Sequence, residues 1–553
     1  MQKISKPLKL FTFTVFLACL MNCSSQQIQS EEEVEAFEKV VVTGSRIQAN
    51  QIAAEAARAK SAVQMELKEE VASYHRVDNN QQIFKTYGVN PTIDTKNTAV
   101  STFAMDVDNS SYKLASHMLE NQRMPHSAGI RVEEFVNSLE YNYAQASQKF
   151  AINAEVFPSP FRQGYHVLHV GIQTQQLTQE NKRGSNLVLV ADVSGSMASD
   201  NKLALLKQAF TTLVSQLDSN DQVAIVGYSD DAFVVLPATK ANNQRKIMAA
   251  INSLETLGST NAEEGILLAY DVAEKMYLPG FNNRVIITSD GMANVGSTDP
   301  KMILNKIEDY KQKGIFLTTV GVGLGMYNDY LLEQLANKGN GNYLYVGNQG
   351  DIQSAFVDGL SKQLQTVAKD SKVQIKFNPN MVSQYRLLGY ENRALKTDDF
   401  TDATKDGGEI GAGHSVTVIY EIKLANAMPN LDFADISIAY KLPQGEKVNY
   451  INKALPYQIL KDTLASTSSD SKLSIAMAAF AEKLRQSYWS RAYRYNDIVV
   501  MLDSLPTQYQ QQKQVKQLRR NIYQAQLIDD RADPFESEHP ISKMNFDRVP
   551  VIE

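Results

Sequence analysis

Between residues 183 and 368, short apolar runs alternate with segments whose apolar residues recur at helical spacing. Runs of this length are too short to span a bilayer and are typical of strands buried in a parallel sheet. The alternation therefore predicts an α/β fold, with a doubly wound, mostly parallel, Rossmann-like sheet that carries helices on both faces. The expected strands are residues 186–192, 222–228, 232–237, 284–289, 315–322 and 343–346, and the expected helices are residues 201–217, 243–254, 262–277, 299–313, 328–337 and 350–368. Because only a short turn joins the second and third strands, they should form a hairpin with one antiparallel edge strand.

The first expected strand ends in a group of oxygen-bearing side chains. Asp192, Ser194 and Ser196 follow it at alternate positions on a Gly-containing turn. Open α/β sheets bind ligands at the carboxyl ends of their strands, and Thr260 and Asp290 fall at further ends of this kind. Because Mg²⁺ prefers oxygen ligands and keeps some of its water, the five residues predict a magnesium site, although Ca²⁺ and Mn²⁺ also accept oxygen ligands. In the alternative interpretation the motif residues cap the following helix and Asp290 is a turn residue.

The five residues resemble the metal-ion-dependent adhesion site of von Willebrand factor type A (VWA) domains. The resemblance implies that Ser194 and Ser196 ligate the cation directly and that Thr260 does so directly or through water. It implies that Asp192 and Asp290 act mostly through waters and orient the hydroxyls. The undersaturated ion would then take an acidic side chain from a partner protein, so the expected function is metal-dependent protein binding.

The segments on either side of the α/β region resemble the flanking regions of a family of bacterial envelope proteins with VWA domains. This resemblance covers residues 95 to 545 and implies an architecture rather than an activity. The segments that carry it are residues 102–112, 131–134, 385–393 and 407–414.

Catalytic alternatives find little support in the sequence. Residues 183–368 contain no histidine, so Ser194 and Ser196 cannot form a Ser-His nucleophile within this region. His166 and His169 would face opposite sides of a strand, which argues against a zinc site. We therefore expect a protein that is not an enzyme, and hydrolysis through the flanking regions is the last-ranked alternative.

The N-terminus has the pattern of a targeting signal. Three lysines precede an apolar run over residues 10–21, and Cys23 follows it. The pattern resembles a bacterial lipoprotein signal over residues 1–22 with Cys23 as the lipidated residue. Cys19 is the alternative lipidation site, and an ordinary secretory signal is the alternative kind of signal. The expected location is the bacterial cell envelope, lipid-anchored at the outer membrane on its periplasmic or surface side.

The remaining composition predicts a flexible tether over residues 23–94, an α+β N-terminal flanking domain over 95–182, a VWA domain over 183–368, and a β-rich and then helical domain over 369–545. Within the tether, residues 38–47 resemble a segment near the start of many TonB-dependent receptors, and they are otherwise expected to be an exposed strand. With 55 basic and 61 acidic residues and no dense basic block, the chain is not expected to bind nucleic acid. The expected function is a metal-dependent protein-binding module of the envelope. The alternative is a structural or scaffolding lipoprotein whose metal only stabilises the fold.

Overall fold

The computed structural model describes residues 74–77, 82–105, 107–177, 182–290, 300–323, 328–425, 430–537 and 539–541. The predicted signal, both cysteines and the 38–47 segment lie outside these residues. The chain divides into two units, residues 1–72 and 73–553, and every described residue belongs to the second. Among the described residues, no helix has the length and apolar character needed to cross a membrane.

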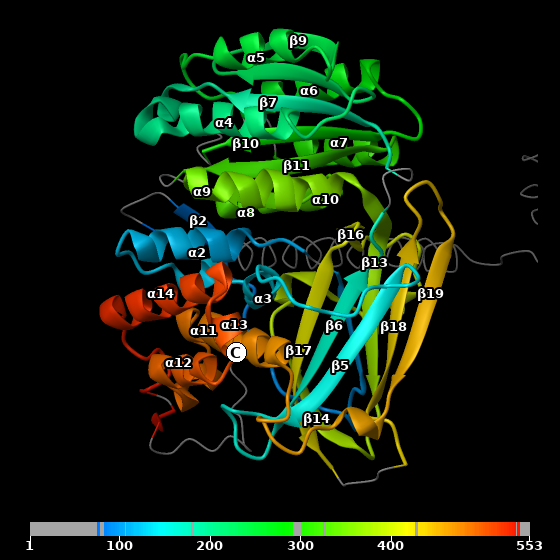
Figure 1. The fold of residues 1–553 in the computed structure, drawn as a ribbon, viewed down its shortest axis with the longest axis vertical. Coiled ribbons are helices and arrows are strands. Elements are labelled where there is room, and N and C mark those ends of the chain that lie inside the picture. The colour runs from blue at the N-terminus through cyan, green and yellow to red at the C-terminus, as the bar shows by residue number, and fades with distance from the viewer. Residues whose placement is uncertain are drawn as a thin grey trace, which may run out of the picture. The chain divides into compact units, whose positions relative to one another are not determined.

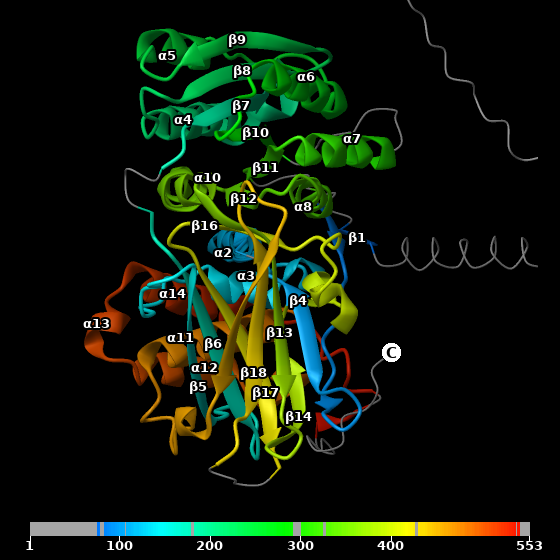
Figure 2. The ribbon, with the colours of Figure 1, turned by 90° about the vertical axis from the view of Figure 1, so that its right-hand side faces the viewer.

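The central region is a six-stranded sheet with helices on both faces, which confirms the predicted α/β class (Figures 1 and 2). The strand order is β12-β11-β10-β7-β8-β9, and every neighbouring pair is parallel except β8 and β9, the predicted hairpin. The strands are β7 (Ser185–Asp192), β8 (Gln222–Tyr228), β9 (Ala232–Lys240), β10 (Asn282–Ser289), β11 (Ile315–Val322) and β12 (Tyr343–Val346).

Alternating residues of β7 face two separate cores, because successive side chains of a strand point to opposite faces. Leu187 and Leu189 belong to a cluster with Phe210 of α4, whereas Val188 and Val190 belong to a cluster with Tyr270 of α6. The helices of this region are α4 (Lys202–Val214), α5 (Gln244–Asn252), α6 (Ala262–Lys275), α7 (Pro300–Gln312) and α8 (Asp329–Lys338).

The last expected helix of the region, residues 350–368, is more irregular than its pattern indicates. It consists of α9 (Gln349–Ile352), a π-helical stretch η4 (Gln353–Leu360) and α10 (Ser361–Leu364). The chain then enters a strand at Thr366, inside the range predicted to be helical. The helical segment therefore ends earlier than the pattern predicts.

The two flanks do not form the separate domains predicted over residues 95–182 and 369–545. Their strands share two sheets, of order β15-β4-β13-β18-β19, with β16 on β13, and β3-β14-β17-β6-β5. β4 pairs with β13, and β6 pairs with β17, so hydrogen bonds between the flanks build both sheets (Figure 2). The bounds are β3 (Ile93–Asp94), β4 (Val100–Ala104), β5 (Phe150–Pro158), β6 (His166–Thr174), β13 (Thr366–Phe377), β14 (Val382–Leu387), β15 (Ala394–Leu395), β16 (Gly408–Gly411), β17 (Ser415–Leu424), β18 (Ala434–Lys441) and β19 (Val448–Leu455). Alternating patterns identify strands, but they do not identify the partner of each strand.

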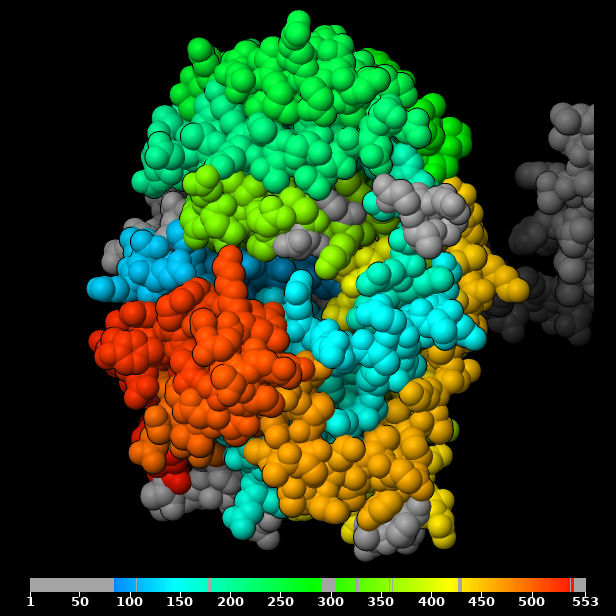
Figure 3. Space-filling model, in the orientation of Figure 1, coloured from blue at the N-terminus to red at the C-terminus, as the bar shows by residue number. Residues whose placement is uncertain are grey.

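A helical layer, built from both flanks as well, packs beside these sheets. Phe135 from the N-terminal flank and Phe480 from the C-terminal flank lie in one core cluster. The space-filling view shows the blue N-terminal segment beside the red C-terminal segment, below the green region (Figure 3). The helices are α2 (Ser110–Glu120), α3 (Val132–Asn137), α11 (Ser469–Leu484), α12 (Tyr495–Asp503), α13 (Thr507–Gln510) and α14 (Lys513–Ile528), with a short hairpin, β1 (Tyr74–Val77) and β2 (Gln82–Lys85), before them.

Candidate metal centre

The predicted site residues lie at one edge of the central sheet. Asp192 is the last residue of β7 and pairs in register with Tyr228, the last residue of β8. Asp290 directly follows β10, which pairs with β7 on its other side. Because these strands are parallel, their carboxyl ends meet at the edge where such sheets bind ligands.

Three oxygens of the Asp192–Ser196 loop converge. The amide and the hydroxyl of Ser194 both donate to Asp192 Oδ1, at 3.0 and 2.6 Å, and Ser194 Oγ lies 3.1 Å from Ser196 Oγ. Asp192 and Ser194 are buried, Ser196 is half-buried and Gly195 is exposed. The oxygen group therefore begins in the sheet core and reaches the surface at Ser196.

These contacts weaken the helix-cap interpretation. The N-cap residue of α4 is Asn201, whose side chain makes no capping hydrogen bond. Ser194 precedes a 3₁₀ segment, residues 195–201, and also makes no side-chain capping bond there. The Ser194 hydroxyl is directed to Asp192 instead, so the loop positions oxygens rather than satisfying helix amides.

Tyr228, which the sequence interpretation missed, holds the other oxygen of Asp192. Its hydroxyl faces Asp192 Oδ2 at 3.0 Å and the Thr288 carbonyl at 3.1 Å. Burial raises the pKa of Tyr228 well above its usual value, so the phenol stays protonated and acts as a donor. Its position at the end of the neighbouring strand was the available signal.

The loop that carries Thr260 lies against the Asp192–Ser196 loop. The Gly195 amide donates to the Gly258 carbonyl at 3.0 Å, and the Leu257 amide donates to the Val193 carbonyl at 2.6 Å. Asp230 holds the loop from its other side, because it accepts from the Ser259 amide at 2.9 Å and from the Ser259 hydroxyl. These backbone contacts fix the loop that leads to the half-buried Thr260 against the motif loop.

Gly258 permits this close contact. A Cβ atom at this position would lie 1.8 Å from Asp230 Oδ2, so any side chain would displace the carboxylate that holds Ser259. The hydrogen bonds from Ser259 lower the pKa of the exposed Asp230, which keeps it ionised and able to accept them.

Asp290 has a partner that the sequence interpretation did not anticipate. Lys202 Nζ lies 3.0 Å from Asp290 Oδ2, and both side chains are buried. Lys202 is the first residue of α4, the helix that follows the motif loop. A basic residue at that point could have been recognised as a neighbour of the strand ends.

The donor set fits a hard divalent cation. All the predicted ligands are oxygens, and they include two buried carboxylates, Asp192 and Asp290, of which Asp290 pairs with Lys202. Burial raises the pKa of Asp192, and the negative charge of Asp290 raises it further, whereas the Ser194 hydrogen bonds lower it. A bound cation would relieve this excess of negative charge. No cluster of three His, Cys, Asp or Glu side chains able to hold a metal occurs among the described residues, so a centre here depends on its hydroxyls.

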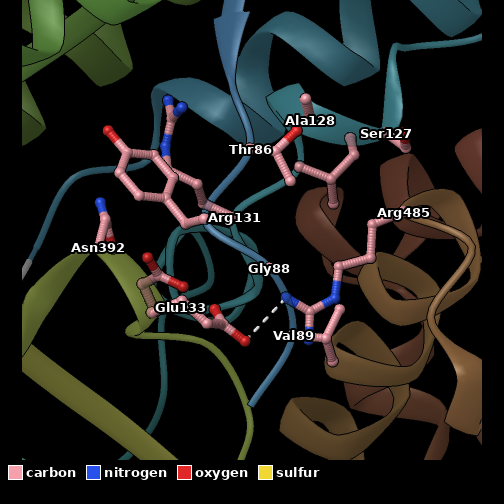
Figure 4. A pocket seen from close by; sticks show the side chains of 12 residues that line it. Thr86, Gly88, Val89, Ser127, Ala128, Arg131, Glu133, Asn392 and Arg485 are labelled. Carbon is pink, nitrogen blue, oxygen red and sulfur yellow. Dashed lines mark hydrogen bonds and ion pairs between the residues drawn. The ribbon is translucent and has the colours of Figure 1, made fainter. Parts of the chain in front are cut away.

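A second polar region surrounds a cavity of about 110 Å³ that none of the predicted metal-site residues lines (Figure 4). Arg131, Glu133 and Arg485 are among its lining residues. Arg131 Nη1 lies 2.6 Å from Asp329 Oδ2 and 3.7 Å from Glu333 Oε2, both on α8, and Arg131 also pairs with Glu134. These buried ion pairs join the α/β region to the N-terminal flank.

Comparisons with known proteins cover the central region and both flanks. Residues 186–357 match the family model for the von Willebrand factor type A domain, residues 78–169 match the model named von Willebrand factor, and residues 362–528 match the model for the C-terminal part of the uncharacterized protein YfbK. The chain is 32% identical over 485 residues to the uncharacterized protein YfbK of Escherichia coli, covering 83% of this chain and 81% of that protein.

Two more distant similarities cover smaller shares of this chain. An uncharacterized protein of Synechocystis is 23% identical over 335 residues, covering 58% of this chain and 76% of that protein. A solved structure, a von Willebrand factor type A protein from Catenulispora acidiphila, aligns with a TM-score of 0.43 and 15% identity over 68% of this chain and 91% of that one. The VWA family consists generally of non-catalytic protein-interaction modules.

Proposed function

Because this chain belongs to the YfbK family and contains a von Willebrand factor type A domain, we propose that it is a metal-dependent protein-binding protein of the bacterial cell envelope. The observation that carries the proposal is the convergence of Asp192, Ser194 and Ser196 within hydrogen-bonding distance at the surface end of the sheet. The protein has no catalytic role in this proposal.

In the proposed mode of binding, Mg²⁺ is held by the two serine hydroxyls and by Thr260, with Asp192 and Asp290 acting mostly through water. Ca²⁺ or Mn²⁺ could take its place, since both accept oxygen ligands. Neutral hydroxyls do not satisfy a divalent ion, and Mg²⁺ bound in this way keeps exchangeable water. A carboxylate of a partner protein completes the coordination and forms the bridge.

The metal site can be tested with Ser196→Ala, because Ser196 is only half-buried and its removal leaves the sheet core intact. We expect the variant to bind Mg²⁺ at least about tenfold more weakly in a calorimetric titration. Ser215→Ala, an exposed hydroxyl at the far end of α4, is the matched control and should bind as the wild type does. Equal magnesium binding by all three proteins would contradict the metal site.

Binding and scaffolding can then be separated in envelope extracts. Affinity capture with the wild-type protein should recover a partner in Mg²⁺ and lose it in EDTA or with Ser196→Ala. If magnesium raises the melting temperature but capture is the same in all arms, the metal only stabilises the fold. The scaffolding alternative then replaces the binding function.

The envelope location rests on Cys23 and can be tested separately. Cells grown with a clickable fatty acid should label the wild-type protein and the Cys19→Ala variant, but not Cys23→Ala. If labelling is lost with Cys19→Ala instead, Cys19 is the lipidated residue. If none of the three proteins is labelled, the N-terminus is an ordinary secretory signal.

A further inference from the structure

The candidate metal centre and the exposed loops around it, which we call the rim, carry charges of opposite sign. With Mg²⁺ bound, the two positive charges of the ion add to the ammonium of Lys202, which pairs with Asp290, and Asp192 supplies the second carboxylate. The centre is then positive by one charge. It attracts one carboxylate, as the proposed bridge requires.

The rim has the opposite sign. Asp200, Asp230 and Asp231 are all exposed in the loops that adjoin the motif. Asp200 lies in the same loop as Ser196, whose carbonyl accepts from the Ser199 hydroxyl at 2.8 Å. Asp230 accepts a hydrogen bond from the amide of Ser259, the residue before Thr260.

No positive charge offsets these aspartates within the same loops. The described loops at this edge of the sheet, residues 193–201, 229–231, 253–261 and 347–351, contain no Lys, Arg or His. Lys202 immediately follows the first loop, but its ammonium is buried against Asp290.

The rim also offers one apolar contact. Leu257 is 48% exposed, although its backbone is fixed by the hydrogen bond to Val193 in the motif loop. An apolar side chain of a partner could cover it while the partner's carboxylate reaches the ion.

Resting on the proposed metal bridge, we infer that the partner is a basic protein segment, with one Asp or Glu for the ion, Lys or Arg on either side of it, and an apolar residue for Leu257. A segment rich in acidic residues would meet like charges at Asp200, Asp230 and Asp231, which costs affinity and slows association. A single carboxylate among cations complements both the centre and the rim. The overall charge of −6 acts in the same direction at long range.

The experiment uses a displayed library of seven-residue peptides with a fixed central Asp and random residues on both sides. The full-length protein selects from it in Mg²⁺, with Ser196→Ala as the background. We expect Lys and Arg to be enriched about threefold or more over Asp and Glu at the flanking positions. A peptide so selected should bind more weakly as NaCl is raised, because surface charges are screened.

Two variants with equal change of charge test the rim itself. Asp200→Asn with Asp231→Asn should weaken a selected basic peptide by about threefold to tenfold without changing Mg²⁺ affinity. Asp200 has a left-handed backbone, with φ of 52°, which Asn tolerates. The control, Asp432→Asn with Asp462→Asn, removes two exposed carboxylates from the flank and should leave the affinity unchanged.

The outcomes separate this inference from the proposed function. Magnesium-dependent selection of neutral or acidic flanks would overturn the basic partner and leave the metal bridge standing. If basic peptides bind equally well in EDTA, or when Asn replaces their central Asp, the metal bridge is contradicted. The inferred role of the partner's carboxylate is contradicted with it. Failure to enrich basic flanks above the Ser196→Ala background also overturns the inference, and the magnesium titration then decides the proposed function by itself.

Discussion

Lys202 sets the charge of the candidate metal centre in the absence of metal. Its ammonium is buried 3.0 Å from Asp290, so Lys202→Met removes this positive charge from beside a buried carboxylate. We expect the variant to lose about 3 kcal/mol of unfolding free energy in EDTA and to regain a large part of it in Mg²⁺. Chemical denaturation in both conditions measures the difference.

Lys207→Met is the control for this substitution, since it removes a lysine of the same helix whose ammonium bonds only to the Asn252 carbonyl among described partners. Its stability should change little, and equally in both conditions. If Lys202→Met is destabilised to the same extent with and without magnesium, the ion does not compensate for the missing ammonium.

Glu409, in β16, should make the stability depend on pH. Its Oε1 atom is buried and accepts no hydrogen bond from the described residues. Burial, followed by the charges of Asp406 and Asp370, raises the pKa of Glu409 to about 8, whereas Lys311 opposes the shift. Between its ordinary value, 4.5, and 8 the folded state holds a proton that the unfolded state has released, so stability falls as pH rises through this window.

Glu409→Gln removes the titrating group and should be more stable than the wild type at pH 8 by on the order of 2 kcal/mol. At pH 4 the two proteins should be nearly equal in stability, because Glu409 of the wild type is then mostly protonated in both the folded and the unfolded state. Denaturation series at the two pH values measure this, and Glu446→Gln, at a carboxylate whose side chain is 83% exposed, serves as the control. If the stability of Glu409→Gln fell with pH as steeply as that of the wild type, Glu409 would not be the group responsible.

At the scale of elements, Arg131 connects α3 to α8. It directly precedes α3 and faces Asp329 and Glu333 of α8 together with Glu134 of α3. Arg131→Met should cost roughly 3–5 kcal/mol, because it leaves buried carboxylates without their cation. Arg123→Met, at an exposed arginine beyond α2, is expected to cost less than about 0.5 kcal/mol. A cost below about 1 kcal/mol for Arg131→Met would show that water or another cation replaces the guanidinium.

The same elements show what the sequence could predict. Periodicity was sufficient for the central sheet, where β8, β11 and β12 have the predicted bounds. It was sufficient for the polar strand ends too, since Asp192 and Asp290 follow apolar runs and parallel strands align their ends. Contacts between distant positions could not be obtained in this way. Lys202 and Asp290 are 88 residues apart, and Arg131 and Asp329 are 198 apart, so each pair depends on the topology rather than on local pattern.

For the whole molecule, the important departure is the sharing of sheets between the flanks. β13, from the C-terminal flank, has β4 of the N-terminal flank on one side and β18 on the other. Fragments 95–182 and 369–545 would each expose unpaired strand edges and half of the sheet core. We expect each fragment alone to lack cooperative unfolding by circular dichroism, and their mixture to recover it. Cooperative unfolding of either fragment by itself would contradict the shared module.

Trp489 allows the connection between the VWA domain and this module to be measured in the intact chain. It is the single tryptophan, it lies in the C-terminal flank, and it is buried. Its fluorescence therefore reports the unfolding of the flanks, whereas Mg²⁺ would bind in the VWA domain. If Arg131 and its partners make the two regions unfold together, magnesium should raise the denaturation midpoint seen by Trp489 as much as that seen by circular dichroism. In Arg131→Met the two midpoints should separate, with only the circular dichroism signal keeping a magnesium-dependent part. If magnesium does not change the denaturation midpoint reported by Trp489 in the wild type, the two regions unfold independently, despite their buried ion pairs.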